Sequence, residues 1–349
     1  MPLFSASELT LFARSALVAA GLEPSKAPVV AEILVEADLM GHDTHGLQLL
    51  PSYLRDLKEG RMTPSGEPEV VSRKGAVQVW DGRYLSGVWL TERAFATASE
   101  AAVQFGMGAV SIRRSHHIAC LAAYLPRITG KNQVAMVTCC DPSGASVAPF
   151  GGLDPVFTPD PVAWGIPTAG DPILIDVSAS ITTNGMVNRS AARGDTLKGQ
   201  WLQDSKGRLS NDPAVLSANP KGTLLPVGGQ DHGHKGYAHA LVTETLSQGL
   251  SGFGRIDNPK QWGAVVFVQV FDPAMFAGTE SFLRQATYMA ESCRASRPAP
   301  GHEPVRLPGE RALGRKRSAL AEGVPLADDL VRQLQQAAQS YGLALPRPF

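Results

Sequence analysis

A glycine-rich loop leads into a predicted helix in the stretch Leu224-Leu-Pro-Val-Gly228-Gly229-Gln-Asp-His232-Gly233-His234-Lys235-Gly236-Tyr237, and the helical pattern continues to Gly249. Glycine reaches positive φ without strain and lets a ligand approach the backbone closely. A helix N-terminus offers free N–H groups and the positive end of the helix dipole, and Lys235 adds a full charge there. The stretch therefore predicts an anion site for a phosphate or a carboxylate. The alternative is a glycine-rich turn that only starts a packed helix.

This loop matches neither of the common nucleotide-binding patterns. A nucleoside-triphosphate loop places Lys directly after Gly and before Ser or Thr, whereas here His234 precedes Lys235 and Gly236 follows it. The dinucleotide fingerprint G-x-G-x-x-G follows none of the predicted strands, and its nearest approximation, Gly106-Met-Gly108, leads into a strand instead of a helix. A nicotinamide cofactor would therefore bind outside the doubly wound Rossmann fold.

Composition restricts the class of partner. The chain has 349 residues, which is enough for more than one compact domain, and its 32 basic residues balance 32 acidic ones. A net charge of zero provides no general attraction to nucleic acid or to a membrane surface, so we expect small-molecule or subunit partners. The longest apolar stretch, around Ala264 to Phe271, is far too short to span a membrane. The N-terminus lacks the pattern of a signal peptide, and four cysteines without a disulfide framework fit a cytoplasmic protein.

Helix and strand patterns alternate without a strict β-α-β period, which predicts a mixed, non-Rossmann α/β fold. Residues 1–69 with 277–349 are expected to form a helical module, and residues 70–276 a sheet-bearing cofactor-binding domain. The strongest strand is predicted at 263–271, a helix is predicted from Ile118 to Ile128, and the polar segment from Thr182 to Pro226 is expected to be an exposed excursion. Further helices are predicted at 5–21, 25–41, 47–57, 88–103, 279–294, 309–322 and 326–341.

Six of the eight histidines occur in three tight groups, each in a polar loop. A histidine titrates near neutral pH and can therefore exchange a proton with an alcohol or carbonyl oxygen. Individual histidines of these groups could equally be structural hydrogen-bonding residues. A metal site is the other alternative, but no recognised ligand spacing is present, so no metal is expected. The groups are His42 with His45, His116 with His117, and His232 with His234.

Six motifs in one order resemble the type-2 malate/L-lactate dehydrogenase family. That family includes ureidoglycolate and sulfolactate dehydrogenases, diketogulonate reductase and piperideine-2-carboxylate reductase. The resemblance implies hydride transfer between NAD or NADP and a small 2-oxo, 2-hydroxy or 2-imino carboxylate, in a non-Rossmann homodimer. The motifs are Ala37-Asp-Leu-Met-Gly-His-Asp-Thr-His-Gly46, Ser115-His-His-Ile-Ala119, Ala148-Pro-Phe-Gly-Gly152, Ile175-Asp-Val-Ser178, Pro226-Val-Gly-Gly with His234-Lys-Gly-Tyr237, and Leu307-Pro-Gly-Glu-Arg311.

Site residues follow from the same resemblance. It implies that His45 is the proton donor and acceptor, that Thr44 completes its hydrogen-bond relay with a hydroxyl, and that His117 and Asp141 are further catalytic neighbours. The implied cofactor contacts are His117, Ile118, Ala119, Cys120, Leu121, Asp176, Val177, Ser178, Lys235, Gly236, Gly309 and Glu310.

Two features bear on substrate and cofactor. Four residues after His45 the family usually has an Arg that clamps a substrate carboxylate, whereas this chain has Leu49, so Arg55, Arg189 or Arg193 would have to substitute. The segment from Arg306 to Arg317 is dense in basic residues, which favours NADP slightly over NAD because Arg binds an additional phosphate well. Alternatively these residues form a solvated helix face, and Glu310 accepts the ribose hydroxyls of NAD.

Overall fold

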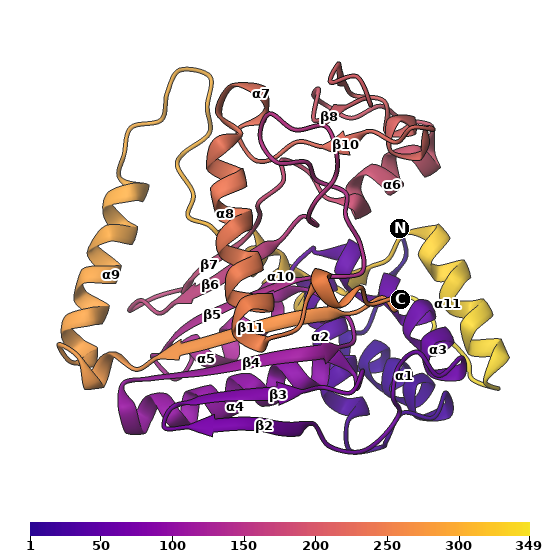
Figure 1. Cartoon of the computed structure of the whole chain (residues 1–349). Helices are drawn as coiled ribbons and strands as arrows, with labels where there is room; N and C mark the ends of the chain where they lie inside the picture. The colour runs from indigo at the N-terminus through magenta and orange to yellow at the C-terminus, as the bar shows by residue number, and fades with distance from the viewer.

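The computed structural model describes residues 1–349, and its centre is a seven-stranded mixed sheet (Figure 1). The strand order is β2-β3-β4-β11-β5-β6-β7, and every neighbouring pair is antiparallel except β3 with β4. This order confirms the predicted mixed, non-Rossmann class, because a doubly wound fold has a mostly parallel sheet. The strands are β2 (Glu69–Lys74), β3 (Val77–Asp81), β4 (Met107–Ser115), β5 (Val134–Cys140), β6 (Pro161–Ile166), β7 (Ile173–Ser178) and β11 (Ala264–Phe271).

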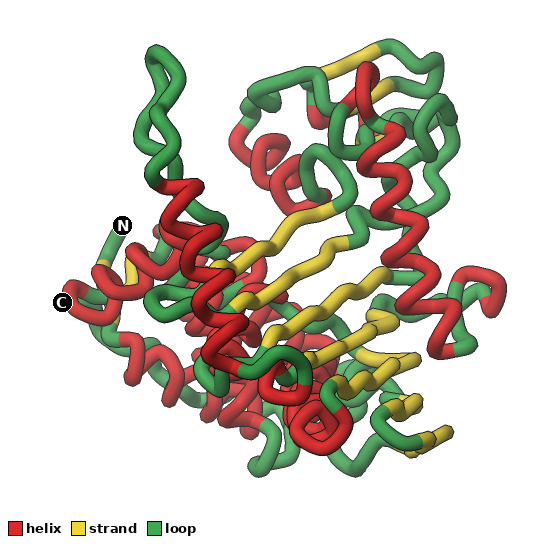
Figure 2. The backbone as a smooth tube through the Cα atoms, turned by 90° about the vertical axis from the view of Figure 1, so that its left-hand side faces the viewer, coloured by secondary structure: helices red, strands yellow, loops and turns green.

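Strand β11 is the most apolar strand and lies at the middle of the sheet. Its sequence Ala-Val-Val-Phe-Val-Gln-Val-Phe has no apolar–polar alternation, as expected for a strand that is covered on both faces. Phe267 pairs with Ser111 of β4 on one side and with Thr138 of β5 on the other. Helix α4 (Gly87–Phe105) packs on one face of the sheet, and α8 (His234–Glu244) crosses the opposite face (Figures 1 and 2).

Segments from the two ends of the chain lie side by side. Strand β1 (Leu3–Phe4) pairs with β12 (Val324–Pro325), and helix α11 packs against α3. In α1, which lies within the helix predicted at 5–21, the apolar stripe from Leu9 to Leu17 is buried. No helix of the chain has the length and apolar character needed to cross a bilayer. The remaining helices are α1 (Ala6–Ala19), α2 (Ala27–Leu39), α3 (Leu50–Lys58), α5 (Leu125–Thr129), α6 (Asn184–Arg193), α7 (Gly229–His232), α9 (Thr279–Arg294), α10 (Glu310–Glu322) and α11 (Asp328–Ser340).

Two expectations from the sequence need correction. The helix predicted from Ile118 to Ile128 is a 3-10 turn (Leu121–Tyr124) followed by the short α5, and Pro126 in the first turn of α5 supplies no backbone N–H. The segment from Thr182 to Pro226 is not a bare excursion, because apolar residues within and beside it form a second, smaller core. It contains α6 and a three-stranded sheet of β8 (Leu202–Gln203), β9 (Leu209–Ser210) and β10 (Thr223–Leu224).

The strand directions bring distant segments to one edge of the sheet. Because β4, β5 and β7 run in the same direction, their C-terminal ends lie at the same edge, together with the N-terminal end of β11. His117, Asp141 and Ser178 therefore come from three separate strand ends that share this edge. The pairing of Ala264 with Ser115 places the residues that precede β11 there as well.

Candidate active site

The loop from Gly41 to Gly46 follows α2 and is held from beneath by a buried carboxyl group. Asp38 accepts a hydrogen bond of 2.7 Å from the backbone N–H of Leu47. A Cβ atom built at Gly46 would lie 2.5 Å from the Asp38 carboxyl atoms, so this close approach requires glycine. Burial raises the pKa of Asp38 to about 8, so this group is mostly uncharged at neutral pH.

His45 lies at the end of a 3-10 turn (Asp43–His45) in this loop. Its Nδ1 atom is 2.9 Å from Oγ1 of Thr44, which fixes the orientation of the imidazole ring. Burial lowers the pKa of His45, and the negative charge of Asp176 opposes that shift only in part. His45 is therefore predominantly neutral near pH 7, which is the form that accepts a proton.

His117 stacks on His45, with ring centroids 6.0 Å apart and planes inclined by 22°. Its Nδ1 atom accepts a hydrogen bond of 3.2 Å from the N–H of Ala119 and lies 2.9 Å from the Tyr53 hydroxyl. Burial, with His45 and His116 nearby, holds the pKa of His117 well below its usual value. Since Nδ1 accepts from a backbone N–H, the single proton of the neutral ring is on Nε2. Trp262 covers the ring at 4.7 Å between centroids.

The adjacent His116 has a structural environment instead. It is completely buried, and its Nε2 atom donates to Asp56 across 3.0 Å. Asp56 is also held by Arg61, at 2.6 Å. Neighbouring histidines thus differ in role, because His116 packs inward from the strand end while His117 stacks on the loop histidine.

A cleft of about 340 Å³ opens between the loop and the end of β7. Asp176 lies at its wall, where Oδ2 accepts from the N–H of Ala122 at 2.9 Å and from the Cys120 thiol at 3.8 Å. The Ser178 hydroxyl donates to the carbonyl of Ser180 at 2.7 Å. The cleft is lined by Met40, Gly41, His42, Ala122, Leu174, Ile175, Asp176, Val177, Pro308, Gly309, Arg311, Ala312 and Arg315.

This lining fits a phosphate-bearing nucleotide. Arg311 and Arg315 contribute two guanidinium groups, and the exposed Val177 provides an apolar surface. Gly309 has a φ of +92°, and a Cβ there would lie 2.7 Å from Leu174, so a larger residue would push the two walls apart. Glu310 is absent from the lining, since its carboxylate pairs with Arg294 and accepts the N–H of Leu307 at 3.0 Å. Among the other basic residues of α10, Lys316 pairs with Glu36 and Arg317 with Asp171.

Three potential metal ligands also meet at this cleft. His42, Cys120 and Asp176 bring ligand atoms to within 4.8 Å of one another. Burial raises the pKa of the Cys120 thiol well above its usual value, whereas a thiolate is the form that binds metal. All four cysteines of the chain are free thiols.

Asp141 follows β5 at the same sheet edge. Its Oδ1 atom accepts from the backbone N–H and the hydroxyl of Ser143, at 2.9 and 2.7 Å. Burial raises the pKa of Asp141, and a further hydrogen bond from the N–H of Gly263 opposes that rise. Because Gly263 directly follows Trp262, Asp141 is linked to the segment that covers His117, but no contact joins Asp141 to His45 or His117.

The glycine-rich loop differs from the simple loop and helix that its sequence predicts. Residues 229–232 form the four-residue helix α7, and α8 begins at His234. Gly236 is buried, and a Cβ there would collide with the backbone at Val227 and Ala179, which follows Ser178 at the end of β7. Lys235 is exposed and has no ion pair within the chain. The loop therefore lies beside the end of β7, but its charge is held by no partner in the chain.

Sequence reasoning did not single out three residues that shape the histidine pair. Tyr53 comes from α3, Trp262 precedes β11, and Asp38 is in the last turns of α2. Each looks like an ordinary core residue in its own helical or strand pattern. Only their contacts with His117 and with the 41–46 loop reveal their role. Helix α2 also carries Glu32 and Glu36, and only the structure shows that Asp38 is the buried acidic residue of the three.

Comparison with known proteins identifies the family. The profile described as malate/L-lactate dehydrogenase matches residues 4–335. The chain belongs to this malate/L-lactate dehydrogenase family. It is accordingly a dehydrogenase that acts on a CH–OH group of a 2-hydroxy acid, with NAD or NADP as the family's cofactor. The resemblance inferred from the six motifs is confirmed.

Relatives of this dehydrogenase carry different names. It is 30% identical to an L-lactate dehydrogenase of Cupriavidus necator, over 96% of each chain. It is also 30% identical to a (2R)-3-sulfolactate dehydrogenase (NADP(+)) of Chromohalobacter salexigens, over 97% of this chain and 98% of the relative. The crystal structure of a malate dehydrogenase from Entamoeba histolytica superimposes with a TM-score of 0.92 at 25% identity, over 99% of both chains.

Proposed function

We propose that this dehydrogenase transfers a hydride between NAD(P)H and C2 of a small 2-oxo, 2-hydroxy or 2-imino carboxylate, with His45 as general acid and base. The observation that carries this proposal is the neutral His45, held by Thr44 and stacked on His117 at the sheet edge where the cleft opens. Lactate, malate and sulfolactate, after which relatives are named, are all small 2-hydroxy acids.

Residues of the chain itself donate and accept the proton. Bound NAD(P)H supplies the hydride to the carbonyl carbon. During reduction His45 donates a proton to the substrate oxygen, and during oxidation it removes that proton. Thr44 keeps the ring oriented through Nδ1, which leaves Nε2 for the substrate. The Nε2–H group of His117 is a second donor beside the same site.

Several segments would hold the cofactor. We assign the nicotinamide end to His117 through Leu121, and the remaining contacts to Asp176 through Ser178, Gly309 and the loop at Lys235 and Gly236. The resemblance adds Glu310, whose carboxylate is also paired with Arg294 and accepts the N–H of Leu307. We propose that Asp141 is a polar neighbour of the site that acts on His117 through the segment of Gly263 and Trp262.

We propose NADP as the preferred cofactor. Arg311 and Arg315 line the cleft without an ion pair in the chain, whereas the acidic group that would select NAD is occupied by Arg294. The comparison of kcat/KM for NADPH and NADH with one accepted substrate tests this assignment. A tenfold preference for NADH, worth about 1.4 kcal/mol, would overturn it.

A screen of small 2-oxo acids with both reduced cofactors tests the central proposal. We expect oxidation of NAD(P)H with at least one acid, and saturable quenching of tryptophan fluorescence by the cofactor alone. Trp262 makes that quenching informative because it stacks on His117. Failure of both signals would exclude a nicotinamide-dependent reaction.

The second candidate function is metal binding without hydride transfer, which the meeting of His42, Cys120 and Asp176 favours. The two candidates differ in what a chelator does. If the first is right, treatment with EDTA leaves cofactor binding and turnover unchanged. Loss of activity on chelation, restored by a divalent cation, would support the second.

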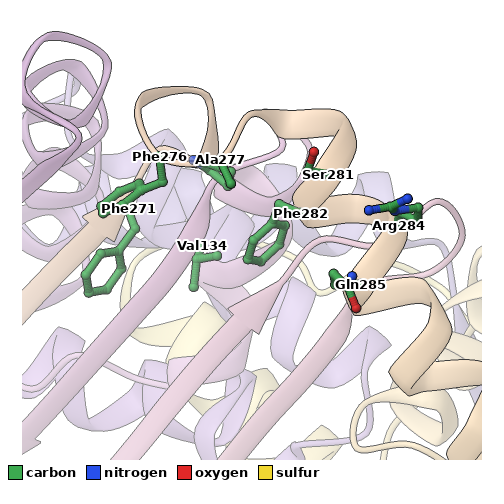
Figure 3. Close-up of a pocket in the computed structure, with 9 residues that line it drawn as sticks. Val134, Phe271, Phe276, Ala277, Ser281, Phe282, Arg284 and Gln285 are labelled. Atoms are coloured by element: carbon green, nitrogen blue, oxygen red, sulfur yellow. The ribbon is translucent and has the colours of Figure 1, made fainter.

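We also propose that the enzyme works as a cytoplasmic homodimer. Helix α9 stands at the edge of the molecule with only Ala290 buried, and Tyr288 and Met289 are exposed. Beside its start is a cavity of about 720 Å³ (Figure 3), which is lined by three phenylalanines and by no histidine or carboxylate. Such apolar surface is typical of a subunit contact. Light scattering during size-exclusion chromatography should give twice the chain mass of 37.0 kDa.

The division into a helical module (1–69 with 277–349) and a cofactor-binding domain (70–276) is likewise a proposal. Its support is the pairing of the two ends of the chain through β1 with β12 and α3 with α11. Limited proteolysis should cut first near residues 69 and 277 if the two units behave separately.

A further inference from the structure

Helix α6 lies against the loop that carries His45. A Cβ atom built at Gly185 would lie 3.8 Å from Cβ of Thr44. Arg189 is four residues later and therefore on the same helix face. Its guanidinium holds Asp43 with two contacts, Nη2 to Oδ1 at 3.0 Å and Nη1 to Oδ2 at 3.2 Å. The guanidinium of Arg189 thus contacts a residue, Asp43, that is only two positions before His45 in the chain.

Other arginines near the site have different contacts. Arg55 is exposed and reaches only Ser52, and Arg193 is exposed at the last turn of α6. Arg315 packs over Gly41 and lines the cofactor cleft. Leu49 packs against the main apolar core and offers no charge. The positive charge of Arg189, by contrast, contributes to lowering the pKa of His45, although burial is the larger cause.

We propose that Arg189 binds the carboxylate of the substrate and that the Asp43 carboxylate occupies this position when no substrate is bound. The two contacts with Asp43 are the bidentate arrangement that a guanidinium forms with any carboxylate. Asp43 is 61% exposed and Arg189 is 26% exposed, so Asp43 can swing into solvent while Arg189 stays in place. The proposal rests on the proposed function, since it names the group that orients a 2-oxo acid for His45.

Oxamate, an unreactive carboxylate with the shape of a small 2-oxo acid, is the probe. Its binding to the NADPH-loaded protein is measured by fluorescence titration for the parent and for Arg189→Ala, Arg189→Lys and Arg193→Ala. We expect Arg189→Ala to weaken oxamate binding by roughly 100-fold, because two charge-assisted hydrogen bonds are lost. The oxamate affinity of Arg189→Lys should lie between those of the parent and Arg189→Ala, because lysine provides one point charge. The matched control Arg193→Ala, on the same helix, should bind oxamate as the parent does.

Two further measurements separate recognition of the carboxylate from a structural role. Asp43→Asn should retain or tighten oxamate binding, because it removes the competing carboxylate and leaves Arg189 intact. If Arg189 merely anchored α6 to the loop through this ion pair, Asp43→Asn and Arg189→Ala would weaken binding alike, which would overturn the proposal. The dissociation constant for NADPH should be the same in every variant, which shows that each is folded.

Other outcomes distinguish this proposal from the proposed function. Oxamate binding by Arg189→Ala equal to that of the parent would overturn the role of Arg189, even if 2-oxo acids are reduced. A parent that binds NADPH but no oxamate would also overturn it. If binding of oxamate depends on Arg189 while no 2-oxo acid is reduced, the proposed reaction fails and the carboxylate site stands.

Discussion

Two histidine pairs of this molecule have similar geometry and different surroundings. The rings of His45 and His117 have centroids 6.0 Å apart, and those of His232 and His234 are 6.2 Å apart. The first pair is partly to largely buried, stacked under Trp262 and hydrogen-bonded to Thr44 and Tyr53, and both pKa values are lowered by burial. The second pair is exposed and has no side-chain hydrogen bond, and its one other aromatic contact is the edge of Phe150 against His234 at 5.7 Å between centroids. Burial and fixed ring orientation therefore favour the first pair over the second as the proposed proton-transfer site.

Removal of the loop histidine should have the largest effect. We expect His45→Ala to lower turnover by about 10²–10⁴-fold, the usual contribution of a positioned acid–base group, with cofactor affinity nearly unchanged. His232→Ala is the control from the exposed pair and should keep parental turnover. Steady-state kinetics and cofactor titration provide both measurements. Equal turnover of His45→Ala and the parent would remove His45 from the mechanism.

The pH dependence should separate the two directions of the reaction. Because burial lowers the pKa of His45, its neutral form predominates from below pH 6.5 upward. For alcohol oxidation, kcat/KM should stay level from pH 7 down to that lowered pKa, and then fall about tenfold per pH unit. For reduction, which needs the protonated ring, kcat/KM should fall as pH rises through the same range. A profile that instead breaks well above pH 6.5 in both directions would indicate a different titrating group.

The carboxyl group beneath the loop gives a third test, on stability. The pKa of Asp38 is about 8 in the folded chain and near 4 when unfolded, so the unfolded chain loses this proton first. Stability from this group is complete below pH 4 and is lost as pH rises toward 8, by on the order of 1 kcal/mol per pH unit. Asp38→Asn keeps an acceptor for Leu47 and cannot ionise. Its free energy of unfolding should therefore exceed that of the parent at pH 8 but not at pH 4, in denaturant titrations.

The sequence predicted the class of the fold and most of the elements because their local patterns are strong. The apolar run at 263–271 became the central strand, and the helix predicted at 279–294 has those bounds in the structure. The helix at 118–128 was wrong because an apolar pattern says little about where the chain leaves a strand end. In that segment Ala119 has a φ of +57°, which no helical pattern anticipates.

The site was predictable only in part, since its contacts join segments far apart in the chain. The glycine-bracketed loop with Thr44 and His45 is a local signal, and the motif resemblance added Asp176 and Gly309. The hydrogen bond from Tyr53 to His117 spans 64 residues, and the Arg189–Asp43 pair spans 146. Nothing in either local sequence specifies such a pairing. Glu310 shows the reverse, because the motif suggested a ligand contact and the structure pairs its carboxylate with Arg294.

The smallest effect of a substitution is expected beside the exposed histidine pair, where Lys235 follows His234. Its ammonium group is free to meet a phosphate of the cofactor, but water competes at an exposed position, so the contribution of such a charge is modest. We expect Lys235→Ala to raise the dissociation constant for NADPH by about three- to tenfold and to leave turnover at saturation unchanged. Lys198→Ala, another exposed lysine without an ion pair, is the control. Because the effect is electrostatic, it should shrink between 0.05 and 0.5 M salt, on the scale set by a Debye length of about 10 Å at 0.1 M. An unchanged dissociation constant at low salt would leave the glycine-rich segment as a turn that packs Gly236 against the end of β7.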